Sequence, residues 1–220
     1  MVRSLVPSLL IFLLGVHAGA ADRLFVRPWI ELEPVVRIDP ANYPLPLDVA
    51  EKDVLEVGRV LVSGMIYGWT FTYIPSDKAR QVSETFTLMP VAQVAWGNPR
   101  LRVTETEVSD ARLWARIAYA LDDEEALRRS AWDSNTADLS TGRGAVSVMQ
   151  GPTGRAASLD AAIRDAIRLS LDTRWVNKPR QIDGEVVLWD DPVTVVGSGM
   201  YTTVAKVKLL VRELVPYRIF

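Results

Sequence analysis

The 220-residue sequence contains no cysteine, and its one histidine is His17. Without cysteine there is no disulfide framework, no thiolate zinc site and no cysteine nucleophile. His17 lies in a segment that we expect to be removed. The chain that remains has no histidine for a Ser-His-Asp triad, a histidine general base or most zinc sites. Catalysis would therefore depend on carboxylate, lysine, tyrosine or serine–lysine chemistry.

Long apolar runs are scarce, and the main one is at the N-terminus. Arg3 is followed by a largely apolar stretch from Leu5 to Val16, and then by the small residues 18–20. This is the pattern of a secretory signal, and it is shorter than the ~20 residues that span a bilayer. We expect cleavage after residue 20, with an uncleaved anchor as the alternative. Export without cysteine favours the bacterial periplasm, or the cell exterior.

The sequence also lacks a large excess of charge of either sign. Basic residues number 25 and acidic residues 27, and the formal net charge is −2. Nucleic-acid binding requires a basic face, so we expect no nucleic-acid partner. Hydrophobic residues make up 49% of the chain, which is ordinary for a folded domain with a core.

The sequence divides into five segments. Residues 1–20 are the signal, and residues 21–46 are a proline-rich extended lead-in with room for one strand. Residues 47–121 form a first α+β unit and residues 158–220 a second. Between them, residues 122–157 hold a short charged helix and a flexible connector.

Three motifs recur in the same order in the two units. Each unit has a helix opening on Leu-Asp-x-Ala-x-basic-Asp, a Trp-x-Asx-Pro turn and an alternating strand. We therefore predict an α+β fold of two similar helix-plus-antiparallel-sheet units, interpreted as an internal duplication, with chance resemblance as the alternative. The first unit carries an insertion with an extra strand over residues 67–74. The motif ranges are 47–53 and 159–165, 96–99 and 189–192, and 114–121 and 204–211. The expected core residues of the two alternating strands are Ile117, Tyr119, Val207 and Leu209.

The connector is rich in Gly, Ser, Thr and Asp over residues 134–155, which predicts a mobile loop. It leads to a helix that we expect to begin near Ser158, a residue type suited to capping. An anion could bind at that helix start. An ordinary flexible connector is the alternative, because the glycine spacing is that of neither a P-loop nor a dinucleotide-binding turn.

Two sets of side chains are candidate sites. Tyr67, Trp69, Phe71 and Tyr73 alternate along one predicted strand and so share a face. If exposed, this face would be a platform for a partner protein, a peptide or sugar rings; if buried, it is core. Asp190 and Asp191 are the candidate pair for carboxylate chemistry, against the alternative of a plain turn before Pro192.

Residues 158–212 resemble a small α+β module of exported bacterial envelope proteins. The residues that carry the resemblance are 162–166 (AIRDA), 184–187 (GEVV) and 201–208 (YTTVAKVK). The family includes the LPP20-type lipoproteins and the N-terminal region of the flagellar protein FlgT. The resemblance implies a structural or assembly role in the envelope or at a flagellum, with no catalytic residues. This chain departs from the family in lacking a lipobox cysteine.

These observations favour an exported, non-enzymatic structural or interaction protein of the bacterial envelope. Its expected partner is another envelope protein, with self-association left open, and no cofactor or metal is expected. One alternative is a periplasmic module that binds a small molecule or saccharide between the two units. The other is a carboxylate-dependent hydrolase.

Overall fold

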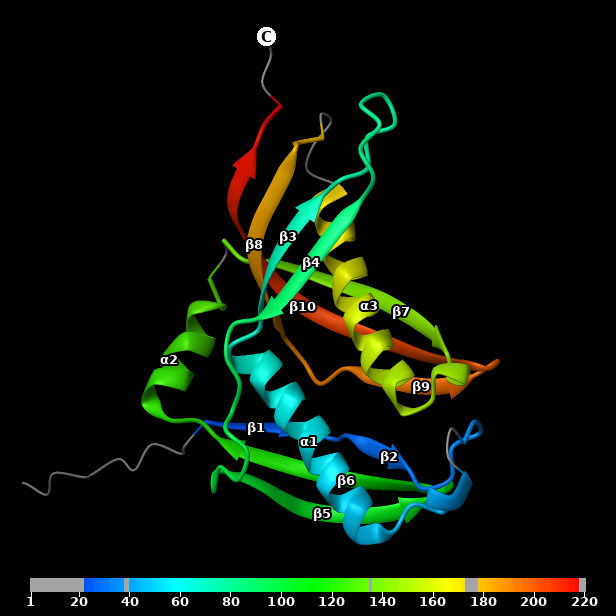
Figure 1. The fold of residues 1–220 in the computed structure, drawn as a ribbon. Helices are drawn as coiled ribbons and strands as arrows, with labels where there is room; N and C mark the ends of the chain where they lie inside the picture. The colour runs from blue at the N-terminus through cyan, green and yellow to red at the C-terminus, as the bar shows by residue number, and fades with distance from the viewer. Residues whose placement is uncertain (1–21, 38–39, 135, 173–177, 218–220) are drawn as a thin grey trace, which may run out of the picture.

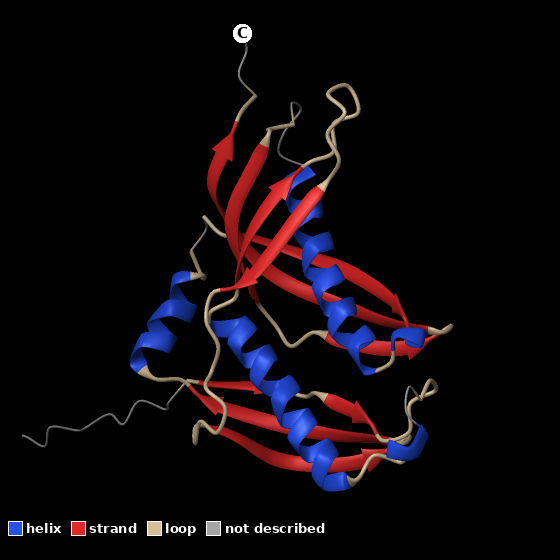
Figure 2. Cartoon of the chain, in the orientation of Figure 1, coloured by secondary structure: helices blue, strands red, loops and turns tan. Residues whose placement is uncertain are grey.

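The computed structural model describes residues 22–37, 40–134, 136–172 and 178–217, so the predicted signal lies outside the described residues. The described chain forms three α-helices and ten strands arranged in two antiparallel sheets. Figures 1 and 2 show one sheet above the other, each with a long helix against it. The α+β class predicted from the sequence is confirmed.

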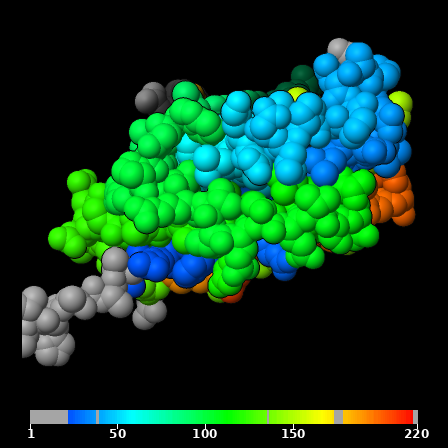
Figure 3. Space-filling model, turned by 90° about the horizontal axis from the view of Figure 1, so that it is seen from below, coloured from blue at the N-terminus to red at the C-terminus, as the bar shows by residue number. Residues whose placement is uncertain are grey.

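The lower sheet is centred on β6 (Arg112–Ala120). One edge of β6 pairs with β5 (Leu101–Ser109); the other pairs with β1 (Arg23–Val26) and β2 (Trp29–Glu31), which follow one another along it. The helix α1 (Leu47–Ile66) packs on this sheet through its apolar stripe. Seen from below, α1 in cyan and the β5–β6 hairpin in green lie side by side across the molecule (Figure 3).

The upper sheet is larger and is covered by α3 (Pro152–Asp172). Its central strand is the long β10 (Met200–Val215), which pairs with β7 (Asp138–Ser147) on one edge. The other edge of β10 pairs first with β9 (Val193–Gly197) and then with β8 (Gln181–Leu188). Beyond β8 the sheet continues through β3 (Trp69–Ile74) to β4 (Thr85–Pro90).

The two sheets share a connectivity. In each, the last strand of the unit lies at the centre and is entered through a hairpin with a two-residue turn. The turns are Asp110-Ala111 and Ser198-Gly199, and all four residues have positive φ, which suits the right-handed twist of the strands. This common order describes the arrangement and does not establish duplication. The predicted core residues of β6 and β10 are all fully buried: Ile117, Tyr119, Val207 and Leu209.

The predicted flexible connector is wrong for much of its length, because residues 138–147 form β7. The glycines that suggested a loop are instead required by packing. A Cβ on Gly142 would lie 2.2 Å from the backbone of Ala162 and Ala166, and one on Gly144 would lie 2.1 Å from the Ser158 carbonyl oxygen. These two positions let α3 lie almost against the strand.

The helix boundaries also differ in part from the sequence predictions. The helix expected to begin near Ser158 begins at Pro152, and Ser158 is buried within it, bonded to Thr203 over 2.6 Å. The short charged helix is confirmed as α2 (Asp123–Ala131). Asp122 and Glu125 form a capping box at its start, which satisfies two backbone N–H groups.

The predicted first unit does not remain in one sheet. Its insertion forms the β3–β4 hairpin, which joins the upper sheet because β3 pairs with β8. The apolar run 91–95, which precedes the first Trp-x-Asx-Pro turn, lies outside any helix or strand. The lead-in 21–46 contains two short strands and a short 3-10 helix (Pro40–Asn42), where one strand was expected. Within the described ranges, no helix has both the length and the apolar character needed to cross a bilayer.

Candidate functional site

The aromatic strand predicted as a docking platform belongs to the core. Phe71 and Tyr73 are 2% and 4% exposed, and both rings pack against Phe86 of the neighbouring β4. Tyr67 and Trp69 are half-buried, and Trp69 fills the space beside a glycine of α1. The platform prediction is wrong, because α3 and β4 enclose the face on which these rings lie.

The adjacent carboxylates Asp190 and Asp191 bind different partners. Asp190 forms an ion pair of 2.9 Å with Lys206 of its own sheet. Asp191 instead accepts a 2.7 Å hydrogen bond from the backbone N–H of Arg27 in the lower sheet. Its other oxygen is buried without a partner, and burial raises the pKa of Asp191. The two carboxyl groups therefore hold different elements together.

A second polar cluster surrounds Glu125 at the start of α2. The Glu125 carboxylate, 4% exposed, accepts hydrogen bonds from the hydroxyls of Tyr67 (2.9 Å) and Tyr119 (2.8 Å) and from Arg100 (2.6 Å). Burial opposes its negative charge, but the hydrogen bonds from the Asp122 backbone and these side chains outweigh burial and lower its pKa. The carboxylate oxygens of Glu125 therefore already accept hydrogen bonds from this chain. The cluster holds α2 against the end of α1.

A cleft of about 410 Å³ lies between the two sheets. One wall consists of β2 and the exposed side of α1, and the other of the first turns of α3 together with the start of β9. We call this hollow the interunit cleft. Its lining is mostly apolar: Pro28, Trp29, Ile30, Val57, Val60, Leu61, Pro152, Ala156, Leu159 and Pro192. The polar lining residues are Arg27, Asp53, Glu56, Thr153, Arg155 and Thr194.

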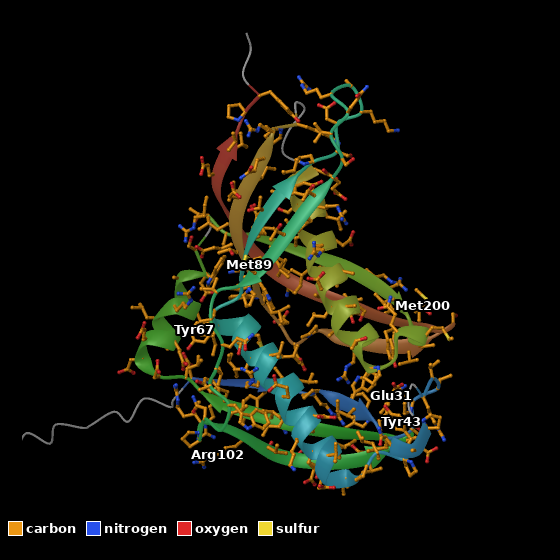
Figure 4. The ribbon with its side chains drawn as sticks, viewed as in Figure 1. Glu31, Tyr43, Tyr67, Met89, Arg102 and Met200 are labelled. Atoms are coloured by element: carbon orange, nitrogen blue, oxygen red, sulfur yellow. The ribbon has the colours of Figure 1, made fainter. Side chains whose placement is uncertain are left out.

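A smaller hollow of about 90 Å³ extends the cleft past Trp29 and Arg155. It is lined by Glu31 and Tyr43 from the lower side and by Tyr201 from the upper sheet. In Figure 4, Glu31 and Tyr43 lie together beneath the start of α3, and Tyr67 lies at the other end of α1, beside α2. The cleft and the Glu125 cluster therefore occupy opposite ends of the boundary between the units.

Trp29 is the centre of the cleft wall. Its ring is 5% exposed and lies 5.9 Å from the ring of Trp114. The guanidinium of Arg155 lies 4.8 Å from the Trp29 ring centroid, and that of Arg112 lies 4.5 Å from it. Two guanidinium groups therefore pack on this ring, and such cation–π contacts stabilise it in the cleft wall.

The sequence alternative of a ligand between the two units agrees with the position of this cleft, but sequence reasoning did not identify its residues. Trp29 stands in a proline-rich stretch without periodicity, and Asp53 has the pattern of a solvent-facing helix residue. A second signal was the hypothesis of an anion at the start of the second long helix. It was placed at Ser158, whereas the helix begins six residues earlier, at Pro152.

The described residues offer no candidate metal site. Over the described ranges, no three or more His, Asp or Glu side chains gather closely enough to hold a metal ion. The candidate site is therefore a cleft with apolar walls and a few charged groups, of the kind that binds small organic ligands.

Comparison with known proteins gives two matches. A protein-family model matches residues 15–217, which include every helix and strand described above. An uncharacterized protein of Treponema pallidum (strain Nichols) is 24% identical over 192 residues, covering 87% of this chain and 81% of that protein. No solved structure matches the chain. Neither match concerns the LPP20-type or FlgT-type module, so that resemblance stays a prediction.

Proposed function

The chain belongs to the protein family whose model matches residues 15–217, and on that premise we propose that it is an exported, non-catalytic binding protein. Its ligand would be a small, largely apolar molecule held in the interunit cleft. The observation that carries the proposal is the composition of the cleft, about 410 Å³ of mostly apolar wall around Trp29. That volume is within the range of small-molecule sites, which bind through apolar walls and take orientation from a few polar groups.

The position of the cleft also supports a binding role. Its two walls come from different sheets, which are joined at this end by the Arg27–Asp191 and Tyr201–Glu31 hydrogen bonds. Pockets at the boundary between two packed units are a common place for ligands. The structural alternative, an envelope or flagellar assembly protein, rests on the resemblance of residues 158–212 and on a working surface at a sheet edge or at the strand over residues 67–73. Because Phe71 and Tyr73 are buried, we place the working surface at the cleft instead.

The binding test uses the neutral fluorescent probe N-phenylnaphthylamine, which brightens in apolar sites. We expect the purified protein to bind it. Ala156 is exposed at the cleft wall, so Ala156→Trp should fill the cleft and weaken binding by about tenfold or more, equivalent to about 1.4 kcal/mol. The matched control is Leu169→Trp, at an exposed position of the same helix that is not part of the cleft. Absence of probe binding, or equal binding by both variants, would overturn the proposal.

Export is tested separately. The leader pattern over residues 1–20 and the bacterial origin of the relative support a periplasmic protein. Mass spectrometry of the protein recovered from its native host should find an amino terminus at Ala21. An intact Met1 on cytosolic material would contradict export. It would not affect the binding proposal, which the probe experiment tests.

A further inference from the structure

Arg155 is placed where a ligand in the interunit cleft would meet it. It is the fourth residue of α3 and lines both the cleft and the smaller hollow beyond it. The Arg155 side chain is half-buried, and its guanidinium lies over Trp29 at 4.8 Å from the ring centroid. The side chain therefore presents its charge at the junction of the two hollows.

The charge of Arg155 has no direct partner among the described residues. Arg59, Arg100, Arg164 and Arg168 each form an ion pair of 2.7 Å or less with a carboxylate. Within the described part of the chain, the guanidinium of Arg155 forms neither an ion pair nor a hydrogen bond; it is the carbonyl oxygen of this residue that accepts a hydrogen bond from the Ser158 hydroxyl. Burial lowers the pKa of Arg155 to about 10, and the more distant Glu31 and Asp53 offset only part of that effect. Arg155 is thus a cation at neutral pH with unused hydrogen-bond donors. Leaving a half-buried cation without a carboxylate partner is costly, and a bound anion would reduce that cost.

The start of α3 adds positive potential at the same place. Pro152 and Thr153 line the cleft, and the first turn of this 21-residue helix contains no acidic residue. The unpaired N–H groups at a helix start carry a partial positive charge that favours anions. In α2, by contrast, Asp123, Glu124 and Glu125 occupy the first turn.

We propose that the interunit cleft binds a singly charged anionic amphiphile, with its carboxylate or phosphate head on Arg155 and its apolar body along Trp29 and α1. This inference rests on the proposed function and specifies its ligand class. Asp53 lines the opposite wall, on α1, and its carboxylate opposes a second negative charge. The two charged residues therefore have opposite effects on the head group. Arg155 attracts a negative head group, and Asp53 disfavours a second negative charge on it.

The test compares ligands that differ only in the head group. Decanoate, the singly charged phosphodiester decyl methyl phosphate and the neutral decanol are each used to displace N-phenylnaphthylamine from the purified protein. Hydrogen bonds to a charged group are stronger than those between neutral groups, so we expect at least one anion to bind about tenfold more tightly than decanol. Which anion binds more tightly identifies the head group as a carboxylate or a phosphate.

Two variants assign the effect to residues. Arg155→Gln should remove the advantage of the anion over decanol. Asp53→Asn should strengthen binding of the anion relative to binding of decanol. Because Asp53 is exposed, this second variant keeps the test valid even if Arg155→Gln impairs folding.

The outcomes separate the two proposals. If the probe binds, but decanol competes as well as both anions or Arg155→Gln changes nothing, the anion inference is overturned and the binding function stands. If neither the probe nor any decyl compound binds, both are overturned. High salt should weaken anion binding while leaving decanol binding unchanged, since the interaction is electrostatic.

Discussion

The hydroxyl of Tyr201, on β10 of the upper sheet, donates a 2.6 Å hydrogen bond to the carboxylate of Glu31, on β2 of the lower sheet. Tyr201 is 2% exposed. Burial and the neighbouring Glu31 carboxylate raise the pKa of the Tyr201 phenol, so it remains a donor throughout the physiological range. This bond ties the sheets together beside the interunit cleft.

Removing that donor should destabilise the protein. Tyr201→Phe leaves the Glu31 carboxylate without its hydrogen-bond donor, and we expect the free energy of unfolding to fall by about 1.5–3 kcal/mol. Urea denaturation measures the change. Glu31→Gln is the matched control, because its amide oxygen still accepts the bond, and its loss should be smaller. Equal stability of Tyr201→Phe and the parent protein would show that the bond contributes nothing.

The glycines of β7 should be intolerant of any side chain. Alanine at position 142 would place a Cβ 2.2 Å from the backbone of α3, which cannot move aside as a flexible side chain could. We expect Gly142→Ala to cost about 1–3 kcal/mol, measured as a lower unfolding midpoint. Gly197→Ala is the control, because no atom lies within 4 Å of its added Cβ, and its stability should be unchanged or slightly higher. A result in which the two variants behave alike would refute the close packing of α3 on β7.

The aromatic strand should behave as core. Phe71→Ala removes a ring that is 2% exposed, and we expect a loss of about 3–5 kcal/mol in the free energy of unfolding. Val195→Ala, at a position 55% exposed, is the surface control and should change stability by less than about 0.5 kcal/mol. A Phe71→Ala protein that is as stable as the parent would restore the strand as an accessible surface.

The Glu125 cluster should make stability depend on acid. The pKa of Glu125 is lowered in the folded protein, so its stabilisation is complete above the unfolded pKa of about 4.3. It is lost as the pH falls through the folded value, because the unfolded chain then binds the proton more readily. Glu125→Gln should cost about 2–3 kcal/mol at neutral pH, since the hydrogen bonds from Arg100 and the two tyrosines lose their charged acceptor.

The pH dependence provides the control for that variant. The stability difference between parent and Glu125→Gln should narrow between about pH 7 and about pH 3, because protonation removes the charge in the parent too. Tyr67→Phe removes one donor and should lower stability less, while the pH dependence persists. Burial first, and then the Glu125 carboxylate, raise the pKa of Tyr67 to about 12, so its phenol should ionise late in an absorbance titration. A stability difference that stays constant with pH would contradict the charged state of Glu125.

The sequence by itself determined those helices and strands that depend on the residues within them. Period-two alternation predicted the central strands β6 and β10 and the burial of Ile117 and Val207. The short charged helix after residue 121 was also predicted, because its acidic side chains cap the backbone of their own first turn. The absence of cysteine excluded disulfides and thiolate chemistry without reference to any fold.

The tertiary structure alone decided what depends on distant partners. In the sequence, Gly142 and Gly144 predicted a loop. In the structure they allow α3 to pack closely on β7, and the sequence near a glycine does not show which distant element will pack against it. The face of Phe71 and Tyr73 became core because α3 and β4 enclose it, which periodicity cannot tell from an exposed stripe. The cleft brings Trp29, Asp53 and Arg155 together from three elements widely separated along the chain. No local pattern encodes such a meeting, since it results from how the two sheets pack.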